Sequence, residues 1–215
     1  TDQYLLSLPP NTTVETELSV VLGEDGVLFA GPNYRFQHAE VRQHSQAYID
    51  QHSQAYIDTS SPANFFGQPT VSQLRLDTAH LYSRGGGVRV AVIDTGIDFS
   101  HPLFAGRIGF PAYDFVDNDT NPQEEGSGAA GYGHGTFVAG LIALAAPGAV
   151  IIPLRAFGPD GTGTTFNVAK AIRYAADQGA HVINLSFGLL IEDSLIKDAL
   201  DYASSKAYMV ASAGN

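Results

Sequence analysis

Two residues in this sequence could form an acid–base pair, and each stands beside glycines. Asp94 ends the apolar run Val88–Ile93 and is followed by a Thr-Gly pair, while His134 stands between Gly133 and Gly135. An imidazole can act as a general base when a carboxylate holds its other ring nitrogen. Taken singly, the aspartate could equally cap a turn and the histidine could be structural. Together they could form a general base oriented by a carboxylate, if folding brings them into contact.

The elements that must position these residues follow from the hydrophobic pattern. Strands are expected at Val88–Ile93, Val150–Leu154, His181–Leu185 and Tyr208–Ala211, and helices at His134–Ala146, Thr165–Gln178 and Glu192–Lys206. Strands that alternate with helices predict a parallel sheet with right-handed crossovers. Asp94 then lies at the carboxyl edge of the sheet, where such proteins gather their active sites. The small residues Gly135, Ala139 and Gly140 allow the helix that begins at His134 to pack closely on the sheet.

The segments Val92–Gly96 and Gly133–Gly140, with aspartate before histidine, resemble two motifs of the subtilisin family, the subtilases. The resemblance runs from about Phe65 to Asn215, and Phe137 replaces a non-catalytic histidine that is usual in the family. It implies an α/β fold: a subtilisin-like three-layer parallel sheet with helices on both faces, incomplete at the C-terminus. It also implies a serine endopeptidase that hydrolyses peptide bonds of proteins.

The same resemblance implies roles for further residues. Asn215 matches the asparagine that donates a hydrogen bond to the oxyanion. An extended substrate would add as an antiparallel strand along Gly161, Thr162 and Gly163. The specificity pocket would use Ser186, Phe187, Gly188, Ser212 and Gly214. The large Phe187 and the small Ser212 and Gly214 predict a roomy, apolar pocket.

No G-T-S-x-A motif, the family's setting for its nucleophilic serine, occurs in these residues. Ser186 is a poor substitute, because its surroundings lack the first glycine of a nucleophile elbow. The chain as given is therefore expected to be a truncated precursor that is inactive alone. The alternative is a non-catalytic, calcium-stabilised peptide-binding domain, a pseudoprotease. A nucleotide-binding domain is disfavoured, because Gly85–Gly87 precede the strand whereas a dinucleotide fingerprint follows it.

Three carboxylates, Asp114, Asp117 and Asp119, fall within six residues. Such groups repel one another unless a cation is bound. The spacing differs from the EF-hand loop but resembles the calcium loop of thermitase-like subtilases. That resemblance adds Asn121 and Gln123 as ligands of a structural calcium ion. The alternative is a solvated acidic turn.

The N-terminal part differs in character from the rest. Leu18–Leu22 and Val27–Phe29 are expected to be two short strands joined by a turn. Gly26–Tyr34 resembles the end of a subtilase propeptide, although it could also be an extension that packs on the domain. An eight-residue segment is duplicated in tandem at residues 43–58. The organisation expected is a propeptide-like segment at 1–37, a linker at 38–62 and a partial peptidase domain at 63–215.

The composition of the chain restricts the classes of partner that it is expected to bind. The 22 acidic residues outnumber the 11 basic ones, which argues against nucleic acid as a partner. No apolar run approaches the length of a membrane span, and the absence of cysteine excludes a disulfide framework. The expected partners are polypeptide substrates and the protein's own propeptide. By resemblance, the protein is expected to be secreted and bacterial.

Overall fold

The structure, a computed structural model, describes residues 4–37, 65, 67–189 and 191–212. The linker expected at 38–62 lies entirely outside the described residues, as do Gly214 and Asn215. All structural statements below concern the described ranges.

The core of the fold is a five-stranded parallel sheet with strand order β3-β4-β2-β6-β7. The strands are β2 (Arg89–Asp94), β3 (Tyr113–Asp114), β4 (Val150–Arg155), β6 (Val182–Leu185) and β7 (Tyr208–Ala211). Their central members are continuous apolar runs, because both faces of the sheet are covered. The parallel α/β sheet expected from the sequence is confirmed, and the four expected strands lie within one residue of their expected positions.

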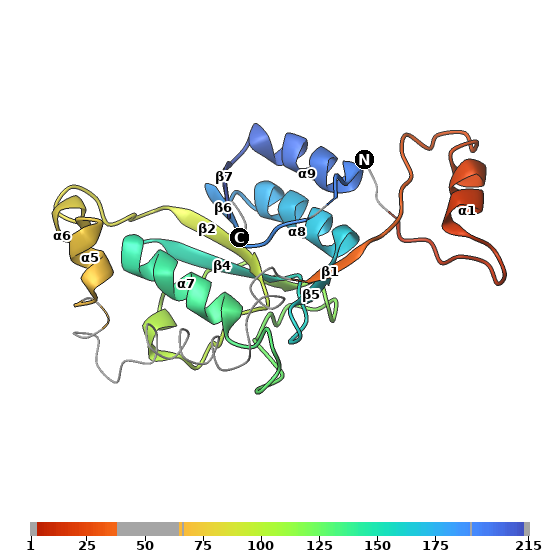
Figure 1. The fold of residues 1–215 in the computed structure, drawn as a ribbon. Coiled ribbons are helices and arrows are strands. Elements are labelled where there is room, and N and C mark those ends of the chain that lie inside the picture. Colours follow the sequence, from red (N-terminus) through yellow and green to blue (C-terminus); the bar gives the residue numbers. More distant parts are fainter. Residues whose placement is uncertain (1–3, 38–64, 66, 190, 213–215) are drawn as a thin grey trace.

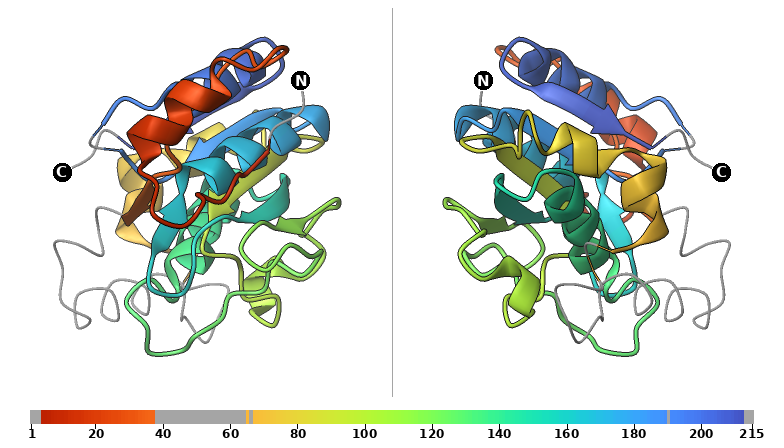
Figure 2. Two further views of the ribbon diagram at one scale, coloured as in Figure 1. Left: turned by 90° about the vertical axis from the view of Figure 1, so that its right-hand side faces the viewer. Right: turned by 90° about the vertical axis from the view of Figure 1, so that its left-hand side faces the viewer.

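Helices cover both faces of the sheet, as Figures 1 and 2 show. Helix α7 (His134–Ala145) packs Val138, Ala139 and Ala143 against Val92 and Ile151 on one face. Helices α8 (Thr165–Asp177) and α9 (Ser194–Ser204) pack on the other face. The three layers were expected from the sequence and are confirmed.

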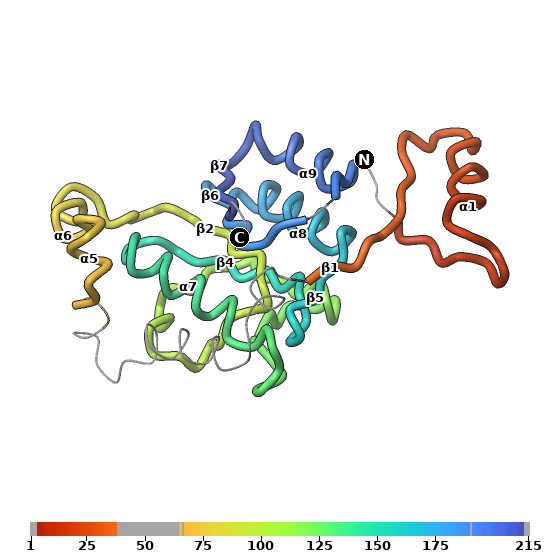
Figure 3. The backbone as a smooth tube through the Cα atoms, viewed as in Figure 1, coloured from red at the N-terminus to blue at the C-terminus, as the bar shows by residue number. Residues whose placement is uncertain are grey.

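The remaining elements are short. They are α5 (Pro69–Gln73), α6 (Leu76–Ala79) and the 3-10 helix η1 (Pro102–Phe104). A separate two-stranded sheet joins β1 (Arg35–Gln37) to β5 (Thr162–Thr164) in antiparallel register. Figure 3 shows the N-terminal chain running from β1, beside β5, out to a helix that lies apart from the sheet.

That helix corrects one expectation. Residues 14–21 form α1 (Val14–Val21), and Val27–Phe29 is not a strand, so the two strands expected at Leu18–Leu22 and Val27–Phe29 were wrong. Thr13 caps the helix by accepting a hydrogen bond from the amide of Thr16. Acidic residues in the first turn also favour a helix, through the positive end of its dipole.

Candidate active site

The structure brings Asp94 and His134 together at the carboxyl edge of the sheet. Oδ1 of Asp94 lies 2.8 Å from Nδ1 of His134 and also accepts the Thr95 amide at 2.7 Å. The Asp94 side chain is 1% exposed and that of His134 is 11% exposed. Beside a carboxylate, Nδ1 acts as the donor, so in the neutral ring Nε2 is the nitrogen that can accept a proton. Chemically, the arrangement supplies an oriented base.

Local sequence explains why His134 reaches Asp94. Gly133 precedes α7 with φ 91°, a conformation that favours glycine. Gly135 lies so close to the end of β2 that an added Cβ would meet the carbonyl oxygen of Gly96 at 2.1 Å. Glycine at 135 therefore lets the first turn of α7 lie against the chain that follows Asp94. This supports the role expected for small residues in this helix.

A second carboxylate, Glu124, lies next to the pair and was not among the residues expected from the sequence. Glu124 is 5% exposed and accepts hydrogen bonds from the Thr95 hydroxyl, the Gly133 amide and the Thr136 hydroxyl. Burial raises the pKa of Glu124, the bonds from Thr136 and Thr95 oppose that rise, and the negative charge of Asp94 adds to it. No signal in the sequence marks Glu124, because Thr95 lies 29 positions away.

The segment expected to bind extended peptide already pairs with a strand of this chain. Gly163 lies opposite Phe36 in the antiparallel pair of β5 with β1. The Phe36 ring is buried, with its centroid 5.4 Å from that of Phe157 and 6.1 Å from that of Phe187. The β5 edge can therefore accept an extended chain and bury an aromatic side chain from it.

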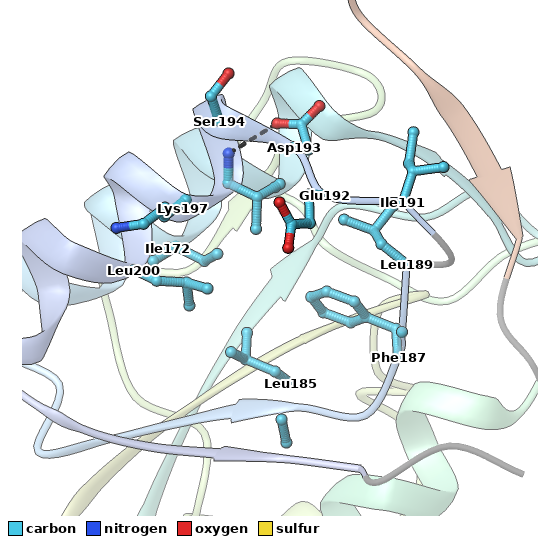
Figure 4. Close-up of a pocket in the computed structure, with 13 residues that line it drawn as sticks. Ile172, Leu185, Phe187, Leu189, Ile191, Glu192, Asp193, Ser194, Lys197 and Leu200 are labelled. Atoms are coloured by element: carbon cyan, nitrogen blue, oxygen red, sulfur yellow. Dashed lines mark hydrogen bonds between the residues drawn. The ribbon is translucent and has the colours of Figure 1, made fainter.

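An apolar pocket of about 640 Å³ opens between the end of β6, the start of α9 and β7. Figure 4 shows Leu185, Phe187 and Leu200 directed toward it. Glu192 and Asp193 also line it, and Asp193 caps α9 by accepting the Ile196 amide. Two of the expected pocket residues, Phe187 and Gly188, are among the lining residues.

The other expected pocket residues are placed as follows. Ser186 is half-buried and accepts a hydrogen bond from the Asn184 amide group at 2.9 Å. Ser212 follows β7, and its hydroxyl lies 3.4 Å from the Phe187 carbonyl oxygen. Gly214 and the expected oxyanion donor Asn215 lie outside the described residues.

The acidic loop expected to bind calcium is paired with a cationic side chain from β4. The buried guanidinium of Arg155 lies 2.6 Å from carboxylate oxygens of both Asp114 and Asp117. Asp114 also accepts the amides of Val116 and Asp117, and Asp119 accepts that of Asn121. Among the described residues, no three acidic or histidine side chains converge as metal ligands do. As arranged here, the loop is held by Arg155 and by its own amides, and calcium stays a prediction.

A parallel sheet between two helical layers, with an aspartate–histidine pair at its carboxyl edge, defines a subtilisin-like α/β protein. Comparison with known proteins agrees: residues 85–215 match the subtilase family. The chain belongs to that family.

Individual relatives match over part of their length. Thermitase from Thermoactinomyces vulgaris is 42% identical over 144 residues, which cover 62% of this chain and 49% of thermitase. The minor extracellular protease Vpr of Bacillus subtilis (strain 168) is 40% identical over 144 residues, which cover 61% of this chain and 18% of Vpr. The chain thus spans about half of thermitase and much less of Vpr.

Solved structures show the same fold. A cold-adapted subtilisin-like serine proteinase is 32% identical with a TM-score of 0.54, covering 62% of this chain and 48% of that one. Fervidolysin from Fervidobacterium pennivorans, a keratinolytic enzyme related to subtilisin, is 30% identical with a TM-score of 0.56, covering 75% and 26%. Separately, none of the helices in the described ranges is both long and apolar enough to cross a bilayer.

Proposed function

We propose that the protein is a secreted serine endopeptidase in which Asp94 and His134 form two thirds of a catalytic triad. The observation that carries the proposal is the 2.8 Å contact between Oδ1 of Asp94 and Nδ1 of His134. Family membership and the similarity to thermitase support it. The similarity to the minor extracellular protease Vpr supports a secreted location.

In the proposed reaction, a serine outside these residues attacks the carbonyl carbon of the scissile bond. Nε2 of His134 takes the hydroxyl proton and then delivers it to the leaving amine as the C–N bond breaks. Asp94 holds the ring in the required tautomer and stabilises the imidazolium. Asn215 would donate to the oxyanion. Water then hydrolyses the acyl-enzyme, with His134 again acting as base.

Substrate would bind as an extended strand along Gly161–Gly163, with its side chains directed into apolar pockets. Two observations support this proposal: β5 already pairs with β1, and Phe187 lines an apolar pocket. The segment that contains β1 would be the propeptide, which occupies the edge until it is removed. Calcium, held by Asp114, Asp117, Asp119, Asn121 and Gln123, would stabilise the folded domain.

The test uses the natural full-length gene product and a fluorophosphonate probe, which labels activated serines covalently. We expect labelling, and a fall of about 10⁴-fold in peptide hydrolysis for Asp94→Asn, because the histidine tautomer is lost. Asp201→Asn is the matched control, since that exposed aspartate lies on α9 and pairs with Lys197. A full-length product that is folded but never labelled would favour the peptide-binding alternative.

A further inference from the structure

The buried carboxylate of Glu124 has hydrogen-bond partners that link the two halves of the candidate site. Its Oε1 accepts the Thr95 hydroxyl at 2.6 Å and the Gly133 amide at 2.8 Å. Its Oε2 accepts the Thr136 hydroxyl. Buried glutamates are rare unless paired, and these partners are all neutral donors.

These partners flank the two residues of the pair. Thr95 directly follows Asp94, Gly133 directly precedes His134, and Thr136 lies in the first turn of α7. The network also closes on itself, because the Thr95 hydroxyl accepts the Gly135 amide at 3.0 Å. The Glu124 backbone joins the same region, since its amide donates to the Ile97 carbonyl at 3.2 Å. One side chain therefore ties the chain after β2 to the start of α7.

This link matters because Asp94 and His134 come from different elements. The hydrogen bond between them depends on where the first turn of α7 lies relative to the end of β2. A hydrogen bond weakens steeply when its distance or angle changes, so small displacements of either element would weaken it. We propose that Glu124 is a positioning residue, which fixes the start of α7 against the end of β2 so that His134 stays bonded to Asp94.

The role of Glu124 in catalysis rests on the proposed function, but its effect on the Asp94–His134 hydrogen bond can be measured without any catalytic activity. The proton between Nδ1 of His134 and Asp94 should give a far-downfield NMR signal in the 215-residue chain, assigned by its loss in His134→Ala. Glu124→Leu removes every acceptor contact of the side chain at similar size. Glu124→Gln keeps an oxygen for Thr95 and Gly133 and turns its amide group toward the Thr136 hydroxyl, which can also accept.

The matched control is Glu125→Gln, which removes the same charge at the neighbouring residue. Glu125 is 53% exposed and pairs with Arg155 at 3.4 Å, whereas Glu124 is the residue that accepts from Thr95 and Thr136. Thr95→Val is a second route if Glu124→Leu does not fold, because it cuts the bond beside Asp94 and leaves Glu124 in place. Circular dichroism establishes that each variant is folded at the temperature of measurement.

We expect the signal to persist in Glu125→Gln and Glu124→Gln. In Glu124→Leu and Thr95→Val, its exchange with water should be at least about tenfold faster, the factor for losing one hydrogen bond to a charged group. A folded Glu124→Leu with wild-type exchange would overturn the proposal. If Glu124→Leu does not fold, a wild-type exchange rate in Thr95→Val would overturn the proposal instead. An increase in exchange in Glu125→Gln as large as that in Glu124→Leu would also overturn it. Absence of fluorophosphonate labelling would instead count against the proposed function and leave this result unchanged.

Discussion

Nδ1 of His134 lies 2.8 Å from Oδ1 of Asp94, although the two residues are 40 positions apart in the sequence. Gly135 is what allows this approach. An added Cβ there would meet the Gly96 carbonyl oxygen at 2.1 Å and the Asp94 side chain at 3.2 Å. The close fit between α7 and the end of β2 therefore leads to a direct prediction for this glycine.

We expect Gly135→Ala to lower the free energy of unfolding by a net amount of about 1 kcal/mol. The clash is with backbone, so it cannot be relieved by a side-chain rotation, and overpacking of this kind costs about 1–3 kcal/mol. It outweighs the roughly 1 kcal/mol that alanine gains from helix propensity. Urea unfolding measures the change. Gly188→Ala is the control, because its added Cβ meets no atom within 4 Å; equal effects of the two would contradict the packing argument.

The pairing of β1 with β5 depends on the buried ring of Phe36. The Thr165 amide donates to the Tyr34 carbonyl at 2.9 Å, so its hydrogen exchange reports on whether this segment is attached. We expect Phe36→Ala to speed that exchange by about a hundredfold, since truncating a buried phenylalanine costs about 3 kcal/mol. Val20→Ala on α1 is the control, because Val20 is 55% exposed. Unchanged exchange in Phe36→Ala would show that the strand is held by other contacts.

The calcium proposal predicts that chelation destabilises the protein. Arg155 supplies one positive charge against the carboxylates of Asp114 and Asp117, so this cluster keeps a negative charge that could bind a cation. With calcium at about 100 times its dissociation constant, the folded state should gain about 2.7 kcal/mol relative to protein in EDTA. Asp119→Asn should remove most of that gain, since Asp119 is not among the carboxylates that pair with Arg155. Equal melting temperatures in calcium and in EDTA would leave Arg155 as the loop's cation.

A pH prediction concerns the contact between α8 and α9. The hydrogen bond from Lys206, followed by that from Tyr202, lowers the pKa of Asp177 below its usual 3.8. The folded state therefore favours the ionised carboxylate. The resulting stabilisation is complete above about pH 5, where the carboxyl is ionised in the unfolded chain as well, and is lost as the pH falls through the lowered pKa.

Asp177→Asn should thus be less stable than wild type near neutral pH. The other acid-sensitive groups are the same in both proteins, so their effects cancel when the two free energies of unfolding are subtracted. The difference should stay below about 1 kcal/mol, because the side chains of Asp177 and Lys206 are 49% and 38% exposed. It should shrink toward zero in strong acid. Urea unfolding at a series of pH values measures it, and Lys206→Met should reproduce the trend. A difference that does not vary with pH would contradict the assignment.

From Val88 onward the sequence predicted the three long helices and every strand of the sheet except β3, because continuous apolar runs and helical stripes are local patterns. It failed at α1, where the Thr13 cap and the acidic first turn were overlooked in favour of short apolar runs. It could not indicate β1 as a strand. Residues 35–37 carry no strand pattern, and they are extended because β5 supplies hydrogen-bond partners and the Phe157 and Phe187 rings bury Phe36.

By itself, the sequence determined the alternation of strands and helices and placed Asp94 after a strand and His134 at the start of a helix. Only the tertiary structure decided that the two side chains are hydrogen-bonded and that Glu124 links the chain after β2 to the start of α7. It also decided that Arg155, at the end of β4, pairs with the acidic loop, for which a calcium site or a solvated acidic turn had been expected. The reason is physical: periodicity encodes which residues are buried within one element, whereas a contact across 29 to 41 positions depends on how the elements pack.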